Sequence, residues 1–374
     1  MSTERGSREV NPLLRLGLLG QSVWYDYITR DLLTSGKLSR LITEDGLRGM
    51  TSNPTIFDKA IAGSQLYDDD IRRLSDQSRS PAEIFEALAV ADVRAACDAF
   101  LPLYQDSGGT DGFVSLEVSP ALANDTEGTI HEAERLRQAV GRPNAMIKIP
   151  GTRAGLYAIT HCIAAGINVN VTLLFSVVRY GEVIDAFLAG MERRLDSGLP
   201  LASVASVASF FVSRVDGKVD PLLDRTPSHS LRGKIAIANA CAAYQLFDQT
   251  LNSARWERLA HADARPQRPL WASTSTKDPS LPDVHYVEAL IAPRTVNTMP
   301  PETLDAYRDH GKPALRIQEG IDSAPAQLAA LGESGIDLDT ITRELEEDGV
   351  AKFAASYQSL LAGIETKVGE LVGR

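Results

Sequence analysis

Short apolar segments alternate with longer amphipathic segments along almost the whole chain. The short segments carry apolar residues in runs or at every second position, as strands do, and the longer ones repeat apolar residues every three or four positions, as helices do. Polar clusters containing glycine or proline separate the two kinds of segment. The pattern predicts eight strands, at residues 21–26, 47–53, 112–118, 144–152, 167–172, 204–212, 269–273 and 285–292.

The segments between these strands are predicted to be helical. The clearest helix start lies within the helical stretch 55–104, where Ser80 can act as the cap, Pro81 suits the first turn and Glu83 can complete a capping box. Further helices are predicted over residues 27–33, 125–140, 153–165 and 233–251, after the strand at 167–172 as far as Arg193, and from Pro300 to the end of the chain.

Regular alternation of strands and helices indicates a parallel sheet. Eight repeats in 374 residues favour a closed (β/α)8 TIM barrel with additional helices, including a helical C-terminal segment. An open doubly wound sheet is the alternative, and the absence of a GxGxxG turn after the first strand weakens it. Because no shift in composition marks a linker, we expect a single domain over residues 13–374, preceded by a disordered tail over residues 1–12.

Composition and charge narrow the class of protein. Hydrophobic residues make up 44% of the chain and charged residues 23%, which is ordinary for a soluble globular protein. The net charge of −11 argues against binding to nucleic acid or to an anionic membrane. Three widely spaced cysteines, Cys97, Cys162 and Cys241, and an N-terminus without an apolar signal segment are typical of a cytoplasmic protein. No histidine or cysteine spacing predicts a metal site.

Lys148 lies in the middle of a predicted buried strand, between the apolar residues Ile147 and Ile149. Burial disfavours the charged form of a lysine, and a neutral amine is a nucleophile that can form a Schiff base with a carbonyl. The strand alone is equally compatible with a lysine whose stem packs in the core and whose amine reaches water or a carboxylate.

Other polar residues also fall at or near the C-terminal ends of the predicted strands, where TIM barrels carry their active sites. Taken singly, several have ordinary explanations: Asp26 could cap the next helix, and Asn53 could hold the turn before Pro54. Glu117, inside an apolar strand, is harder to explain, since an unpaired buried carboxylate is costly. The residues in this group are Asp26, Asn53, Glu117, Lys148, Asn170, Thr172, Ser209 and Ser273.

Two cations follow the sixth and seventh predicted strands. Arg214 could clamp a phosphate group through its forked guanidinium, or it could equally be an exposed loop arginine. Lys277 could bind an anion or be fully solvated.

Three segments, taken together, carry a recognisable combination of residues. They are TSNPTIF at 51–57, MIKIPGT at 146–152 and NVNVTLLFS at 168–176. They resemble the signature segments of the transaldolase family, and the resemblance extends from about Gln21 to the C-terminus. The length of the chain and the WAST segment at 271–274 look most like the longer bacterial subfamily, without the phosphoglucose isomerase domain that some relatives carry.

The resemblance implies a pentose phosphate pathway enzyme that needs no metal or organic cofactor. Such an enzyme moves a dihydroxyacetone unit from sedoheptulose 7-phosphate to glyceraldehyde 3-phosphate, giving erythrose 4-phosphate and fructose 6-phosphate. By resemblance, Lys148 would form the Schiff base, Glu117 would position a water molecule that Thr172 orients, and Asp26 would be the acid/base at carbon–carbon cleavage.

The remaining matched positions imply substrate contacts. Asn53 and Asn170 would bind the dihydroxyacetone hydroxyl groups, and Ser209 and Arg214 would bind the substrate phosphate. The chain departs from the family after the seventh strand, where other members carry a second phosphate-binding arginine and this sequence reads STSTK. We therefore expect Lys277, with Ser273, to take that role.

Several alternatives remain open from the sequence. An aldolase that uses the same imine but releases dihydroxyacetone to water would look much the same. A non-catalytic sugar-phosphate sensor on the same scaffold is the other alternative, and the intact lysine with both carboxylates argues against it. The sequence leaves open whether the protein is a monomer or a homodimer, and whether the C-terminal helices cover the barrel mouth or bind a partner.

Overall fold

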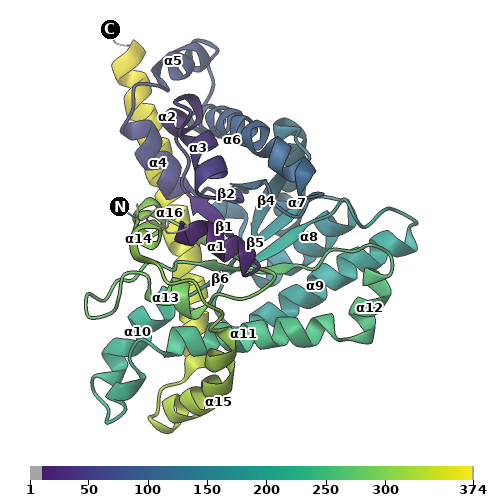
Figure 1. Cartoon of the computed structure of the whole chain (residues 1–374). Coiled ribbons are helices and arrows are strands. Elements are labelled where there is room, and N and C mark those ends of the chain that lie inside the picture. The colour runs from purple at the N-terminus through teal and green to yellow at the C-terminus, as the bar shows by residue number, and fades with distance from the viewer. Residues whose placement is uncertain (1–10, 373–374) are drawn as a thin grey trace, which may run out of the picture.

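Eight parallel strands close into a barrel in the computed structural model, which describes residues 11–372 (Figure 1). Each strand pairs with the next, and the first pairs with the last. The predicted (β/α)8 barrel is therefore confirmed. The strands are β1 (Gln21–Asp26), β2 (Gly49–Thr51), β3 (Phe113–Glu117), β4 (Ala145–Pro150), β5 (Val169–Leu174), β6 (Ser206–Phe211), β7 (Arg268–Ala272) and β8 (Thr295–Met299).

Helices surround the barrel and extend beyond it. They are α1 (Pro12–Leu18), α2 (Arg30–Thr34), α3 (Lys37–Glu44), α4 (Pro54–Ala62), α5 (Asp68–Asp76), α6 (Pro81–Asp106), η1 (Pro120–Leu122), α7 (Thr126–Val140), α8 (Arg153–Ala164), α9 (Val177–Asp196), α10 (Ser213–Leu223), η2 (His229–Leu231), α11 (Ile235–Leu251), α12 (Ala254–Ala260), α13 (His285–Ala289), α14 (Pro301–His310), α15 (Ile317–Glu333) and α16 (Leu338–Val372). None of these helices combines the length and the apolar character needed to cross a membrane.

The local signals explain where individual helices begin. Ser80 and Glu83 form the predicted capping box at the start of α6. Of the expected N-terminal tail, residues 1–10 lie outside the described residues, while Asn11 caps α1 and Pro12 begins it.

One predicted strand is wrong. Residues 285–292 were expected to form the eighth strand, but they contain helix α13, and the strand lies further on at Thr295–Met299. The true strand is unusually polar, since two threonines and Asn297 are buried in it. Hydrogen bonds inside the barrel reach the two threonine hydroxyls and the Asn297 Oδ1, which accepts from Thr274 at 2.9 Å, so tertiary contacts decide the strand rather than apolar alternation.

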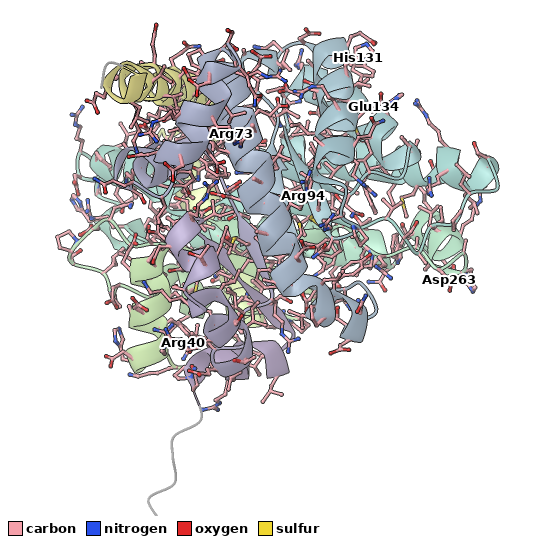
Figure 2. All side chains as sticks on the ribbon, turned by 90° about the horizontal axis from the view of Figure 1, so that it is seen from above. Arg40, Arg73, Arg94, His131, Glu134 and Asp263 are labelled. Carbon is pink, nitrogen blue, oxygen red and sulfur yellow. The ribbon has the colours of Figure 1, made fainter. Side chains whose placement is uncertain are left out.

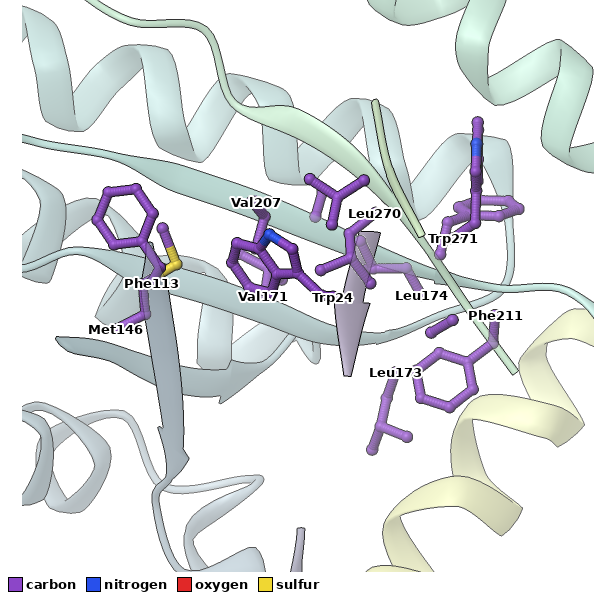
Figure 3. Close-up of a cluster of buried hydrophobic side chains, with 14 of the residues drawn as sticks. Trp24, Phe113, Met146, Val171, Leu173, Leu174, Val207, Phe211, Leu270 and Trp271 are labelled. Atoms are coloured by element: carbon purple, nitrogen blue, oxygen red, sulfur yellow. The ribbon is translucent and has the colours of Figure 1, made fainter. Parts of the chain in front are cut away.

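The barrel interior is filled by large apolar side chains. Trp24 of β1 is fully buried and lies close to Phe113 of β3, with ring centroids 6.5 Å apart (Figure 3). A Cβ atom at Gly49 of β2 would come within 2.5 Å of the Trp24 ring, so only glycine permits this close approach. This packing fills the core beneath the C-terminal ends of the strands.

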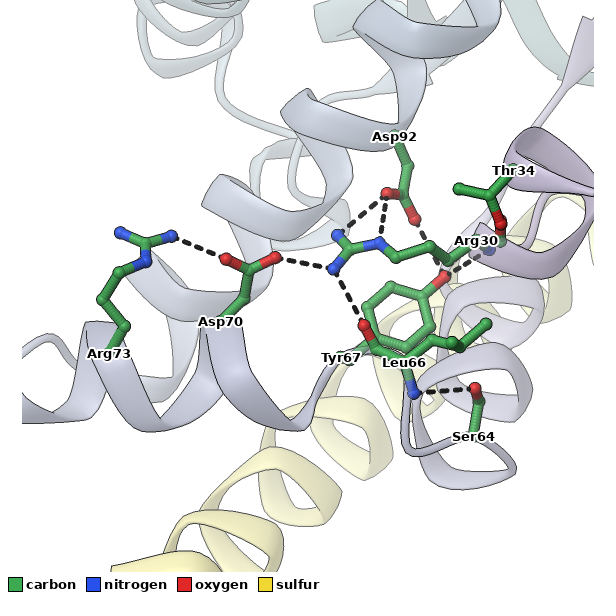
Figure 4. Close-up of polar contacts among 8 residues, drawn as sticks. All are labelled: Arg30, Thr34, Ser64, Leu66, Tyr67, Asp70, Arg73 and Asp92. Atoms are coloured by element: carbon green, nitrogen blue, oxygen red, sulfur yellow. Dashed lines mark hydrogen bonds and ion pairs between the residues drawn. The ribbon is translucent and has the colours of Figure 1, made fainter.

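Charged side chains cover the outer helices, as seen from above in Figure 2, where His131 and Glu134 mark α7. A partly buried network also ties three helices together beside the barrel (Figure 4). Asp92 of α6 accepts hydrogen bonds from Arg30 of α2 at 2.9 and 3.1 Å and from the Tyr67 hydroxyl at 2.8 Å. Arg30 also pairs with Asp70 of α5 at 2.6 Å.

Candidate active site

A cavity of about 410 Å³ opens at the C-terminal ends of the strands. Eight of the ten predicted site residues line it: Asp26, Asn53, Lys148, Thr172, Ser209, Arg214, Ser273 and Lys277. The other two, Glu117 and Asn170, lie on the neighbouring strands on either side of Lys148, each directly opposite it in the strand register. The structure thus gathers all ten in one region.

Lys148 lies inside the barrel and is only 5% exposed. Its Nζ lies 3.6 Å from Glu117 Oε2 and donates a hydrogen bond to the backbone oxygen of Ser52 at 3.3 Å. Both partners of the ion pair are buried, with side chains 6% exposed. The amine is therefore fixed in position at the edge of the cavity and shielded from bulk water.

Glu117 is a strongly perturbed carboxyl of this group. Burial raises its pKa to about 7, and the nearby Lys148 opposes that shift. Neither carboxyl oxygen has a hydrogen-bond partner among residues 11–372, and the same holds for the buried hydroxyl of Thr172. Since buried polar atoms normally have partners, these are the groups left free to hold a water molecule or a substrate oxygen.

Asp26 ends β1 and does not cap the following helix, because Thr29 caps α2 instead. Its Oδ1 accepts a hydrogen bond from Thr51 at 2.6 Å, and Thr51 in turn contacts Thr298 at 2.7 Å. Burial raises the pKa of Asp26, while the charge of Lys148 and the Thr51 hydrogen bond act against this. The carboxyl is thus held in one orientation in the cavity wall, and its raised pKa makes the ionised form a stronger base than an exposed aspartate.

Asn170 is fully buried and does not line the cavity. Its amide donates to Ser115 at 3.0 Å, and its carbonyl accepts from Ser209 at 2.7 Å. The three polar side chains form a chain across β3, β5 and β6. Asn170 therefore orients Ser209, which reaches the cavity.

The end of β5 is irregular. Its register with β6 shifts between Val171 and Leu174, and Leu173 has a positive φ of 62°. A branched residue rarely adopts this conformation, and such strain persists only where the surroundings hold it. The bulge lies directly beside Thr172 and can set the direction of its hydroxyl.

Asn53 has two roles in the structure. Its side chain accepts a hydrogen bond from the Ile56 amide at 3.0 Å and so caps α4, a local role close to the turn-holding alternative. The same side chain also lines the cavity.

The outer part of the cavity is positively charged. Arg214, on α10, stacks over Phe211 at 5.0 Å, and its guanidinium has no carboxylate partner within residues 11–372. Burial lowers its pKa, and Asp26 partly offsets this. Ser273 contacts Ser213 at 3.0 Å, and Lys277 is exposed at the rim.

Sequence reasoning missed a second lysine in the same wall. Lys59 of α4 also lines the cavity and is exposed. It lies on the same face of the helix as Thr55 and Ile56, which also line the cavity, because residues three or four positions apart are neighbours on a helix. The outer part of the cavity therefore offers two lysines besides Arg214, Lys59 and Lys277, where the sequence suggested only Lys277.

The C-terminal helix α16 covers the mouth of the barrel, which the sequence left open. Phe353 of α16 places its ring centroid 5.5 Å from Lys148 Nζ. Ion pairs hold the helix at two points along its length. Glu346 of α16 pairs with Arg179 of α9 at 3.2 Å, and Lys367 of α16 pairs with Asp68 of α5 at 2.8 Å. In Figure 1 the helix, coloured yellow, runs beside α4 and α5.

The fold and this site together define a class of protein: an enzyme built on a (β/α)8 barrel with a buried lysine–carboxylate pair at the C-terminal ends of its strands. The family model for Transaldolase/Fructose-6-phosphate aldolase matches residues 23–364.

Proteins that match this chain over nearly their whole length are named transaldolase. The chain is 51% identical over 359 residues to Transaldolase from Acidothermus cellulolyticus, covering 95% of this chain and 96% of that protein. It is 50% identical over 362 residues to Transaldolase from Parafrankia sp. (strain EAN1pec), covering 96% and 98%. The chain belongs to the transaldolase/fructose-6-phosphate aldolase family.

Proposed function

We propose that this protein is a transaldolase of the pentose phosphate pathway, transferring a dihydroxyacetone unit from sedoheptulose 7-phosphate to glyceraldehyde 3-phosphate. The observation that carries the proposal is the buried Lys148 amine 3.6 Å from Glu117, at the edge of a cavity rimmed by cations. The relatives named transaldolase, about 50% identical over nearly the whole chain, support the same activity.

The reaction begins when the Lys148 amine attacks the ketone carbon of the donor sugar. The resulting carbinolamine loses water and becomes a protonated imine, and this loss needs a proton delivered to the departing oxygen. Glu117 suits that transfer because its pKa of about 7 lets it give and take a proton near neutral pH. The free hydroxyl of Thr172 would hold the water between successive transfers.

Carbon–carbon cleavage follows from the imine. Asp26 takes the proton from the hydroxyl group on the carbon beyond the breaking bond, the bond electrons move into the iminium, and an aldehyde leaves. The three-carbon enamine stays bound to Lys148 until an acceptor aldehyde enters. Attack on that aldehyde returns the proton from Asp26, and water then hydrolyses the imine and frees the lysine.

Substrate binding falls to the remaining predicted residues. Asn53 would bind a dihydroxyacetone hydroxyl group directly, while Asn170 would act by orienting Ser209. Arg214 would hold the phosphate, since it is the cavity guanidinium without a carboxylate partner in the described chain. Lys277 would add charge for the anion, and we add Lys59 to that proposal.

Borohydride reduction in the presence of fructose 6-phosphate tests the proposal. We expect mass spectrometry to find a reduced sugar-derived adduct on the peptide that carries Lys148. Lys148→Met should abolish both the adduct and the transfer activity, whereas Lys59→Met, a matched change at another lysine of the cavity, should still yield the Lys148 adduct. An adduct on a different lysine, or full activity in Lys148→Met, would show the mechanism to be wrong.

A further inference from the structure

A second cavity of about 590 Å³ lies at the opposite end of the barrel, where the strands begin. Ser22, Phe113, Ser206 and Arg268 line it from the starts of β1, β3, β6 and β7. None of its lining residues belongs to the catalytic cavity. Its floor is the Trp24 layer of the barrel core, with Phe113, Met146 and Val207 beside it (Figure 3).

Positive charge is concentrated in this cavity. Four arginines line it, against a single carboxylate, Asp111, although the whole chain carries a net charge of −11. The arginines are Arg48, Arg265, Arg268 and Arg294. Such a local concentration within an acidic protein creates a field that attracts anions.

Only some of the hydrogen-bond donors of these arginines have an acceptor in the described part of the protein. Arg268 donates to Asp111 at 3.1 Å and to Ser22 at 2.6 Å, yet its buried Nε has no partner within residues 11–372. Arg265 donates to the backbone oxygens of Gly109 and Gly108 at 2.5 and 2.6 Å. The half-buried Arg48 guanidinium makes no hydrogen bond or ion pair with the described chain.

Trp24 supplies an independent indication of a ligand. The residue is 0% exposed, it lines the cavity, and its indole Nε1 has no acceptor among the described residues. An indole nitrogen can only donate, and a buried donor without an acceptor is costly. The two unmatched groups beside this cavity, Trp24 Nε1 and Arg268 Nε, are both donors, so the polarity of the site favours a ligand with acceptor oxygens.

We propose that this cavity binds a phosphate group, either as inorganic phosphate or on a small organic molecule. Phosphate suits the site because guanidinium groups bind it in a forked geometry and its oxygens accept several hydrogen bonds at once. The Arg48 guanidinium supplies the unpaired charge, the other arginines add to the positive field, and the apolar floor can accommodate the carbon part of a phosphate ester.

The indole N–H of Trp24 can report on binding directly. The chain has three tryptophans, and Trp24 is the one that lines this cavity, so a protein with 15N-labelled indoles gives few resonances to follow. Titration with inorganic phosphate, and separately with glycerol phosphate, should move the Trp24 resonance and saturate. The tighter of the two ligands then identifies the source of the phosphate group. The same titration of Arg214→Ala should leave the Trp24 response intact, because that variant affects only the catalytic cavity.

Matched arginine variants separate a built site from general charge effects. Arg48→Met keeps an unbranched apolar stem and disturbs no described hydrogen bond, and it should weaken phosphate binding about tenfold or more. Arg40→Met removes the same charge from an exposed position on α3, labelled in Figure 2, and should leave the affinity unchanged. Arg294→Met, also at the cavity and exposed, provides a second variant if Arg48→Met folds poorly. A Trp24 resonance that neither ligand moves, or equal weakening by Arg40→Met and the cavity variants, would overturn the proposal.

Discussion

The aromatic ring of Phe353 lies over the amine of Lys148, with Nζ 5.5 Å from the ring centroid. The two residues are 205 positions apart in sequence, on the final helix and on the fourth strand. A cation over an aromatic face is stabilised electrostatically, and the ring also keeps water from the amine. Phe353 therefore links the C-terminal helix to the proposed covalent chemistry.

Phe353→Ala should change how the bound enamine is used. Without the ring, water can reach the intermediate and protonate it, so release of free dihydroxyacetone should rise relative to transfer, by about fivefold if the ring contributes about 1 kcal/mol. The measurement is the ratio of released dihydroxyacetone to transferred product at a fixed acceptor concentration. Phe353→Leu retains an apolar cover and is the control. An unchanged ratio in Phe353→Ala would contradict a shielding role.

The raised pKa of Glu117 makes the stability of the protein depend on pH. Between about pH 4.5 and 7 the carboxyl is ionised in the unfolded chain but still protonated in the folded protein, so the folded state binds more protons. The contribution of Glu117 to the free energy of unfolding therefore falls as pH rises through this window and levels off above it. Glu117→Gln removes this dependence. We expect the free energy of unfolding of the variant, relative to that of the wild type, to increase by up to about 3 kcal/mol as the pH rises through the window.

Urea unfolding of both proteins at a series of pH values measures this difference. Transfer activity should be low in Glu117→Gln at every pH, because an amide cannot exchange the proton. A constant difference in unfolding free energy from pH 4 to 8 would mean that the carboxyl titrates normally.

Arg214→Ala should weaken substrate binding rather than proton transfer. A charge-assisted contact to phosphate is worth about 2 kcal/mol, which corresponds to about a thirtyfold rise in KM. The effect should vanish with unphosphorylated glyceraldehyde as the acceptor. Arg225→Ala, at an exposed arginine just after α10, is the matched control. Equal effects on phosphorylated and unphosphorylated acceptors would argue against a phosphate contact.

Asp92→Ala should destabilise the protein without altering the site. The substitution leaves Arg30 and the Tyr67 hydroxyl without their shared buried acceptor, which costs about 3 kcal/mol or more. Thermal or urea unfolding gives the change in stability. Asp69→Ala removes a fully exposed partner of Arg72 and should have almost no effect. If Asp92→Ala were as stable as Asp69→Ala, the network in Figure 4 would contribute nothing.

The barrel could be predicted from sequence because most strands follow the rule of buried apolar segments. The eighth strand could not, since Thr295, Asn297 and Thr298 are buried through hydrogen bonds to partners far away in sequence. Local alternation contains no information about those partners. Within the apolar residues 285–292, His285–Ala289 instead form a short helix whose Tyr286 hydroxyl donates to the buried Asp216 at 3.0 Å.

The candidate site could be predicted as a set of strand ends, because the barrel directs those ends to one place. Lys59 and Phe353 were missed because they come from helices and reach the cavity only through tertiary packing. Asn170 was found, but its contact with Ser209 depends on strand register, which a single sequence does not specify.

The position of α16 has a consequence for the timing of synthesis. A ribosome makes every strand of the barrel before it makes Leu338–Val372, so all ten predicted site residues exist in the growing chain while the mouth is still uncovered. A shortened chain ending at α15 would carry the reactive amine and both carboxyls, yet would leave its intermediate open to water. Efficient transfer should therefore appear only when the full-length chain has folded, and messages truncated late should yield protein that breaks down sugars instead of exchanging their fragments.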